Sequence, residues 1–232
     1  MNTTDVGATN VHGVNPQHLV EKILRNRIYD CMYWKEQCFG LTEETLVEKA
    51  IELTYIAGHF GGNQQPSPFL CLLLKMLQMQ PDMEVVMTFI ENGDYKYVTA
   101  LGAMYLRLTG KPVEIYPVLE NLLADYRKVR FRKTIGWEVM HMDEVADLLL
   151  REEYFCNIAL PRLVDRYQLE AMNLLPKRKS ALDEALMSDD DDDMADSDDD
   201  SDDSDDDDEE KKAATVAIDV KVDDDSDSDA AA

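Results

Sequence analysis

Acidic residues gather at the C-terminal end of this 232-residue chain, and their position limits where a folded core can form. Residues 188–232 contain 23 acidic and 3 basic residues, a net charge of −20, whereas the whole chain carries −25. Before Val216 this segment has almost no apolar side chains, so it cannot bury enough surface to offset the entropy lost on ordering. We therefore expect a disordered Asp/Ser-rich tail over 188–232 and a folded body in the residues before it.

Apolar side chains in that body recur every three or four positions, which is typical of amphipathic helices. Asn15 and Pro16 mark a helix start, because asparagine caps unpaired N–H groups and proline at the first helical position loses no hydrogen bond. Apolar residues continue at this spacing through Ile28, and Gly40 ends the segment. Thr42 caps the next helix, whose apolar positions run to Ala57. Further helices are predicted from Asp82, over 94–109, from Ile115, over 143–152 and over about 158–170.

Two segments carry information about packing. Residues 69–79 are apolar nearly all round, which favours a helix in the middle of a bundle. Within the helix predicted over 94–109, Gly102 should cost about 1 kcal/mol relative to alanine. We interpret this glycine as a point where a neighbouring helix backbone comes close.

The pattern changes between residues 127 and 141, where apolar and polar residues alternate on both sides of Gly136, as in a small β-hairpin. No repeat of 30–50 residues is visible, which disfavours a solenoid. The predicted fold class is mainly all-α: an irregular multi-helix bundle with one small β-hairpin near 127–141. The predicted organisation is a flexible N-terminus (1–14), a helical domain (15–175), a basic or helical linker (176–187) and the acidic tail (188–232).

Sequence motifs for catalysis are missing. There is no nucleophile elbow, Walker loop, dinucleotide fingerprint or HExxH helix. The nearest candidate, the Gly-rich segment 58–63, lacks the lysine of a phosphate-binding loop and follows a helix. The four histidines lie far from one another and from the cysteines, so no metal motif is apparent. We predict a protein that is not an enzyme and has no cofactor.

The four cysteines have no CxxC spacing and are expected to be reduced core residues, as in a reducing compartment. Residues 1–18 lack the apolar stretch of a signal peptide. The longest apolar run, 69–77, is interrupted by Lys75 and is too short to span a bilayer. These features predict an intracellular protein without a membrane partner.

The strongest candidate binding feature is a basic run at 127–133 in an otherwise mildly acidic body. Its five charges could contact RNA phosphates, although such charges also occur on solvated strand edges, where they prevent unwanted strand pairing. Aromatic residues and exposed loops add further candidates, although aromatic side chains are more often core than contact residues. The candidate partner- or RNA-binding residues are Tyr33, Trp34, Asn63, Arg127, Lys128, Arg130, Arg132 and Lys133.

The tail contains serines that are followed three residues later by aspartate, the preference of acidophilic kinases resembling casein kinase 2. Each phosphate would add a charge of about −1.5 to −2. The alternative is a passive solubilising tail. The candidate phosphosites are Ser188, Ser197, Ser204 and Ser226.

Several blocks together resemble one known family. They include NPQHLVEKILRNRIYD (15–30), GGNQQPSPFLCLLLKMLQMQP (61–81) and DYKYVTALGAMYLRLTG (94–110). Their order and spacing over about residues 11–186 are similar to the pre-mRNA-splicing factor 38 family, specifically its A-type. Animal members carry an Arg/Ser-rich extension where this chain has Asp/Ser repeats, so a role that depends on a phosphorylated Arg/Ser domain is in doubt.

The resemblance implies a nuclear, non-catalytic scaffold that acts around tri-snRNP incorporation and activation of the spliceosome. It also implies partners: components of the tri-snRNP and of the pre-catalytic complex, including a zinc-finger protein and a microfibrillar-associated-type protein, with possible contact to snRNA or pre-mRNA. The basic segment 176–179 resembles a minimal nuclear-import signal, although four residues with three positive charges also occur often by chance. The alternative suggested by the tail is an acidic-tailed nuclear chaperone of the histone type.

Overall fold

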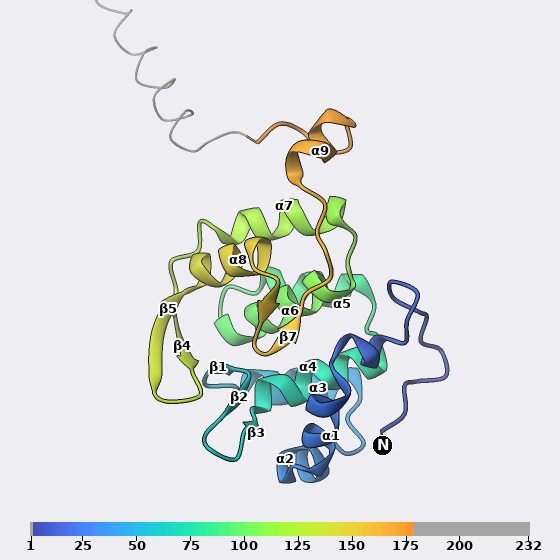
Figure 1. Cartoon of the computed structure of the whole chain (residues 1–232), viewed down its shortest axis with the longest axis vertical. Coiled ribbons are helices and arrows are strands. Elements are labelled where there is room, and N and C mark those ends of the chain that lie inside the picture. Colours follow the sequence, from blue (N-terminus) through green and yellow to red (C-terminus); the bar gives the residue numbers. More distant parts are fainter. Residues whose placement is uncertain (1, 179–232) are drawn as a thin grey trace, which may run out of the picture. The chain divides into compact units, whose positions relative to one another are not determined.

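A computed structural model describes residues 2–178, in which nine α-helices alternate with short strands (Figure 1). The N-terminal part contains the 3-10 helix η1 (Pro16–Leu19), α1 (Lys22–Asp30), α2 (Met32–Gln37), α3 (Glu43–Ile51), β1 (Ile56–Ala57), β2 (His59–Phe60) and β3 (Gln65–Pro66). The central part contains α4 (Pro68–Met79), α5 (Met83–Glu91), α6 (Lys96–Thr109) and α7 (Pro112–Leu122). The C-terminal part contains β4 (Lys128–Arg132), β5 (Trp137–His141), α8 (Met142–Arg151), β6 (Tyr154–Phe155), β7 (Ile158–Ala159) and α9 (Arg166–Ala171). The fold is the mainly helical bundle with one larger hairpin that the sequence predicted.

Helix α6 is the centre of this bundle. It packs against α3 and α4 on one side and against α5, α7 and α8 on the others (Figure 1). All eleven residues from Val98 to Leu108 are buried, including the polar Thr99 and Arg107. The sequence pattern predicted that only one apolar stripe of this helix would be buried. In the structure the opposite face of α6 is buried as well, which the sequence did not predict. Small residues explain it, because Ala100, Gly102 and Ala103 let other helices approach.

Gly102 marks the closest of these approaches, as the sequence predicted. A Cβ atom at this position would lie 2.9 Å from Ile90 Cγ1 and 3.0 Å from Phe89 Cβ, both on α5. The helix expected over 69–79 is confirmed as α4. Nine of its residues are buried, and Ser67 caps it by accepting a hydrogen bond from Leu70 N at 3.2 Å.

The N-terminal region differs from the expected continuous helix. Asn15 does cap a helical turn, but Val20, Glu21 and Cys31 have extended backbones that divide the segment into η1, α1 and α2. As a result Ile23, expected on the apolar face, is 68% exposed. Residues expected to form a flexible N-terminus make contacts instead: Asp5 N donates to Gln78 O at 3.0 Å.

Thr42 caps α3 as predicted, yet that helix ends at Ile51 rather than near Ala57. The residues that follow leave the helix because Ile56 and Ala57 pair in parallel with β4, and this pairing makes β4 the middle strand of the sheet β1-β4-β5.

The helix predicted over about 158–170 is wrong for its first half. Cys156 and Asn157 both have positive φ (49° and 64°), which turns the chain sharply between β6 and β7. Pro161 then disfavours a helical backbone at the residue before it. The helix therefore begins only at Arg166, and Tyr167 in its first turn is 81% exposed.

Candidate interaction surface

The hairpin predicted near 127–141 is present as β4 and β5, paired antiparallel from Lys128 opposite His141 to Arg132 opposite Trp137. Alternation along β4 sorts its side chains between two faces. Val129 is fully buried and Phe131 packs against Phe155, with ring centroids 6.0 Å apart. The basic side chains of β4 therefore lie on the opposite face of the strand.

Arg127, just before β4, is held by contacts within the body. Its Nε lies 3.0 and 2.9 Å from the two carboxylate oxygens of Asp125, and its terminal nitrogens donate to Gly93 O and Thr99 Oγ1. Partial burial acts to raise the pKa of the Asp125 carboxyl, but the hydrogen bonds and charge of Arg127 outweigh it and leave the pKa below its usual value. Arg127 therefore connects the start of the hairpin to the α5–α6 turn. Its guanidinium nitrogens already donate hydrogen bonds within the body and are not free to bind a partner.

The two lysines of the run lie at the ends of β4. Lys133 pairs with Glu138 across the hairpin, with Nζ and Oε2 2.7 Å apart and both side chains largely exposed. Lys128 is exposed, and its carbonyl accepts from Lys96 Nζ at 2.6 Å. A neighbouring carboxylate thus screens the charge of Lys133, whereas Lys128 faces solvent.

Arg130 and Arg132 take part in a cluster with aromatic rings. The Arg132 guanidinium carbon lies 3.7 Å from the ring centroid of Phe60 and 5.0 Å from that of Trp137. The Arg130 guanidinium lies 4.7 Å from the Trp137 centroid. Tyr55 meets Trp137 edge to face, with centroids 5.3 Å apart. We call these five residues the arginine–aromatic cluster: Tyr55, Phe60, Arg130, Arg132 and Trp137.

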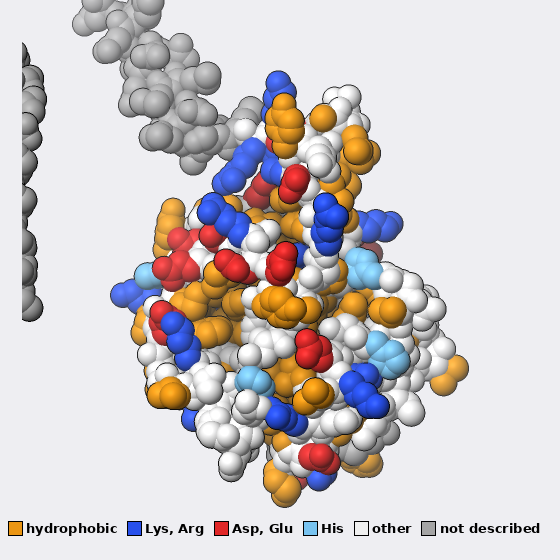
Figure 2. Space-filling view, in the orientation of Figure 1, with side chains coloured by type: hydrophobic (Ala, Val, Ile, Leu, Met, Phe, Trp, Pro, Cys, Tyr) orange, Lys and Arg blue, Asp and Glu red, His pale blue; other side chains and the backbone are white. Residues whose placement is uncertain are grey.

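The cluster has the composition of a binding surface. Arginine, tryptophan and tyrosine are enriched at the positions that carry most of the energy of protein interfaces, and Trp137 is 51% exposed. The same rings could stack on unpaired bases. Figure 2 shows basic, acidic and hydrophobic side chains intermingled on the visible face, without a single basic field. At the hairpin itself, Asp125 and Glu138 pair with Arg127 and Lys133. This mixture of charges favours contacts with protein over electrostatic attraction of RNA.

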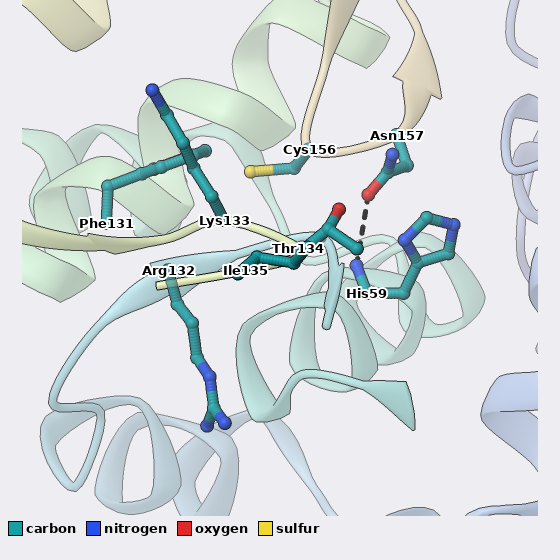
Figure 3. Close-up of a pocket in the computed structure, with 9 residues that line it drawn as sticks. His59, Phe131, Arg132, Lys133, Thr134, Ile135, Cys156 and Asn157 are labelled. Carbon is teal, nitrogen blue, oxygen red and sulfur yellow. Dashed lines mark hydrogen bonds between the residues drawn. The ribbon is translucent and has the colours of Figure 1, made fainter. Parts of the chain in front are cut away.

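Beside the cluster lies a hollow of about 450 Å³ between the hairpin turn and the β6–β7 turn (Figure 3). His59 N donates to the Asn157 side-chain oxygen at 3.0 Å, and Gly61 N donates to Thr134 O at 3.1 Å. The side chains of Arg132 and Lys133 point away from the hollow in opposite directions (Figure 3). Burial raises the pKa of the Cys156 thiol well above its usual value, which keeps the sulfur protonated. The side chains that line this hollow hold turns together and do not converge on a reacting group.

The structure separates the other three candidates. Trp34 is fully buried: its ring packs on Tyr29 and its Nε1 donates to Asn2 Oδ1 at 3.1 Å. It is a core residue, so its selection as a surface contact has to be corrected. Tyr33 is half-buried beside α4, and Asn63 is exposed on the β2–β3 turn that follows Phe60.

Tyr55 and Phe60 were missed from the sequence because neither lies in a recognisable motif. They reach the hairpin only through the parallel pairing of β1 with β4. The candidate phosphosites Ser188, Ser197, Ser204 and Ser226 lie outside the described residues. Within residues 2–178, no group of three or more His, Cys, Asp or Glu could hold a metal ion, and no helix is long and apolar enough to cross a bilayer.

With this geometry established, comparison with known proteins identifies the family. Residues 9–173 match the model of the PRP38 family. The chain belongs to the PRP38 family. It is 56% identical over 184 residues to pre-mRNA-splicing factor 38 of Arabidopsis thaliana, which covers 79% of this chain and 52% of that protein. It is 53% identical to pre-mRNA-splicing factor 38A of Homo sapiens over 184 residues, or 79% of this chain and 59% of the relative.

A PRP38-family chain of known structure has the same fold. A chain in the crystal structure of the Snu23–Prp38–MFAP1(217–258) complex of Chaetomium thermophilum matches with a TM-score of 0.73 and 36% identity. The match covers 81% of the present chain and all of the other. The chain spans only about half to three-fifths of the length of the curated relatives it matches. The similarity therefore concerns the helical body, and it does not extend over the remaining part of those longer relatives.

Proposed function

We propose that this PRP38-family chain is a non-catalytic scaffold of the spliceosome, acting around tri-snRNP incorporation and activation through protein–protein contacts. The observation that carries the proposal is the likeness of its body to a chain solved in complex with Snu23 and a segment of MFAP1. The partners we propose are therefore a zinc-finger protein of the Snu23 type, a microfibrillar-associated protein of the MFAP1 type, and components of the tri-snRNP. We propose a nuclear location for the same reason.

The arrangement of side chains supports a role without catalysis. At the hairpin, Arg127 and Lys133 are paired with carboxylates and Arg130 and Arg132 are stacked on rings, so these groups are not directed at a common point. We propose that the arginine–aromatic cluster is one of the contact surfaces of the scaffold. Its exposed tryptophan and stacked arginines are of the residue types that anchor protein interfaces.

Affinity purification of the tagged full chain from nuclear extract tests the scaffold role. We expect tri-snRNP proteins together with the Snu23-type and MFAP1-type partners. Recovery of histones in their place would favour the acidic-tailed chaperone and would overturn the proposal.

A truncated chain ending at Met187 separates the two functions further. A scaffold that acts through its helical body should keep its partners without residues 188–232, whereas a chaperone that acts through its acidic tail should lose them.

The substitution Trp137→Ala tests the contact surface, with Tyr126→Ala as a matched control, because Tyr126 is also an exposed aromatic residue (71%) and lies outside the cluster. We expect Trp137→Ala to reduce recovery of at least one partner, and Tyr126→Ala to leave the recovery of that partner unchanged. Equal recovery with both variants would exclude the cluster as a contact surface. Loss of crosslinked RNA with unchanged protein recovery would assign the cluster to RNA instead.

A further inference from the structure

A second hollow, of about 430 Å³, lies where α6, α7 and the C-terminal end of α8 meet the segment that follows α8. Arg107 of α6 and Tyr116 of α7 contribute to its wall. The Tyr116 hydroxyl donates to Val164 O at 2.8 Å and so holds the segment 160–165 in place. We call this hollow the Arg107 pocket.

Arg107 is 4% exposed, and its guanidinium is only partly used. Nε donates to Leu149 O at 2.7 Å, a carbonyl in the last turn of α8 that has no partner within its own helix. Among residues 2–178, the two terminal nitrogens have no hydrogen-bond acceptor, and no carboxylate lies within 4.0 Å of any nitrogen of this side chain. Capping of α8 therefore accounts for one of its five N–H donors.

Two other partly buried arginines of the bundle have carboxylate partners. Arg127 is paired with Asp125, and Arg166 is paired with Glu120 and Glu170. A largely buried guanidinium without a counter-charge is unfavourable, and the terminal nitrogens of Arg107 remain open to the pocket. Their planar fork matches the two oxygens of a carboxylate. The pocket thus lacks the kind of group that the fold supplies to Arg127 and Arg166.

The charges on the rim of the pocket indicate which kind of molecule supplies the missing carboxylate. Three acidic residues on the rim, Glu152, Glu153 and Asp165, are exposed. They would repel a polyanion such as an RNA backbone, but they would attract basic residues on either side of a single carboxylate. Of the two basic rim residues, Arg151 is paired with Asp147 at 2.7 Å, and Arg162 is exposed without an ion pair within residues 2–178. The three carboxylates therefore outnumber the one unpaired arginine of the rim.

We propose that the Arg107 pocket is a docking site for one Asp or Glu side chain of a partner protein, in a segment where Lys or Arg residues flank it. The carboxylate accepts from the terminal nitrogens of Arg107, and the flanking basic residues meet the acidic rim. This assignment rests on the proposed scaffold function in one respect: the occupant of the pocket is a protein.

Titration of the purified full chain tests the site directly. The probe is a five-residue peptide with glutamate between two lysines, and the control peptide has glutamine in place of glutamate. The readout is the Nε–H signal of Arg107 in an ¹⁵N spectrum, assigned with Arg107→Lys. Arg27→Lys, on α1 outside the pocket, is the matched control variant, and thermal unfolding followed by circular dichroism checks that both variants fold.

We expect the glutamate peptide to shift the Arg107 signal saturably and the glutamine peptide to bind about tenfold more weakly or not at all. Arg107→Lys should weaken binding by a similar factor, because lysine keeps the charge but loses the fork, and Arg27→Lys should not change it. Equal shifts with both peptides, or none with either, would overturn the proposal. Displacement of the peptide by inorganic phosphate or a short RNA at equal concentration would also overturn it, in favour of a phosphate site.

Failure of this titration would leave the scaffold function standing, because co-purification from extract does not depend on this one pocket. Conversely, recovery of histones in place of spliceosomal proteins would refute the scaffold function without affecting the binding of the glutamate peptide to Arg107.

Discussion

Arg127 and Lys133 stand at opposite ends of one basic run, but their side chains are in different surroundings. Arg127 is part-buried, and its side chain makes three hydrogen bonds to Asp125 and others to Gly93 and Thr99, whereas Lys133 makes one exposed ion pair. Charge alone made these two residues equal candidates for RNA contact. Their contacts give Arg127 a role in the stability of the fold.

The substitution Arg127→Gln should lower the free energy of unfolding by about 1–3 kcal/mol, because several hydrogen bonds to a charged group are lost together. Lys133→Gln should change it by less than about 0.5 kcal/mol, since exposed ion pairs contribute little. Urea denaturation of both full-length variants measures the difference. Similar losses from the two substitutions would contradict the assignment.

The Arg127–Asp125 contact also predicts a dependence on pH. The pKa of Asp125 lies below the ordinary value of 3.8, so its carboxylate stabilises the folded state at any pH above that ordinary value. This contribution is lost as pH falls through the lower, folded-state pKa. The stability gap between wild type and Arg127→Gln should therefore be constant from neutral pH down to about 4 and should shrink below it. A gap that widens on acidification would refute the prediction.

Cysteine reactivity gives another test at this scale. Cys31 Sγ lies 3.7 Å from Cys71 Sγ, and this hydrogen bond is the largest of the effects that lower the pKa of Cys31 to about 7. Burial raises the pKa of Cys38 to about 12. Iodoacetamide should therefore modify Cys31 first in the native protein, at a rate that rises through about pH 7.

Mass spectrometry of the modified peptides measures these rates. Cys71→Ala removes the hydrogen-bond partner and should move the Cys31 profile to higher pH. An unchanged profile would mean that the sulfur–sulfur contact does not control the reactivity of Cys31.

At the scale of elements, the contact between α5 and α6 depends on Gly102. Alanine there would gain about 1 kcal/mol of helix propensity, but its Cβ would meet Ile90 and Phe89 at about 3 Å, and overpacking costs about 1–3 kcal/mol. We expect Gly102→Ala to destabilise the protein by up to about 2 kcal/mol in urea denaturation, as the difference of these two terms.

Gly93→Ala is the matched control, because a Cβ at Gly93 has no heavy atom within 4 Å. Its effect should be small. A stabilising Gly102→Ala would show that α5 and α6 can separate without cost.

Elements with local signals were predictable from sequence, and elements that depend on distant pairing were not. The Thr42 cap, the apolar helix α4 and the alternation in β4 and β5 are all encoded within a few residues. The turn at Cys156–Asn157 carries no glycine, and the apolar residues after it resemble a helix face. The parallel pairing of β1 with β4, which brings Tyr55 and Phe60 to the hairpin, joins segments far apart in sequence.

The candidate site shows the same division. The basic run was visible as a cluster of charges, but which of its members are occupied depends on tertiary contacts with the α5–α6 turn and with β2. Arg107 offered no sequence signal at all, because a single arginine in an apolar helix predicts an exposed position. Only the surrounding helices reveal that it is buried.

At the scale of the whole molecule, residues 2–178 form one compact unit around α6. The matched solved chain is covered completely by this body. We propose that this body alone suffices to hold two different protein partners together.

Reconstitution from purified components tests that claim most directly. The full chain and a chain ending at Met187 are each mixed with a Snu23-type protein and an MFAP1-type segment, and the mass of the complex is measured by light scattering after size-exclusion chromatography. We predict a complex of one copy of each component for both chains. Absence of the complex, or its formation only when residues 188–232 are present, would contradict the scaffold account.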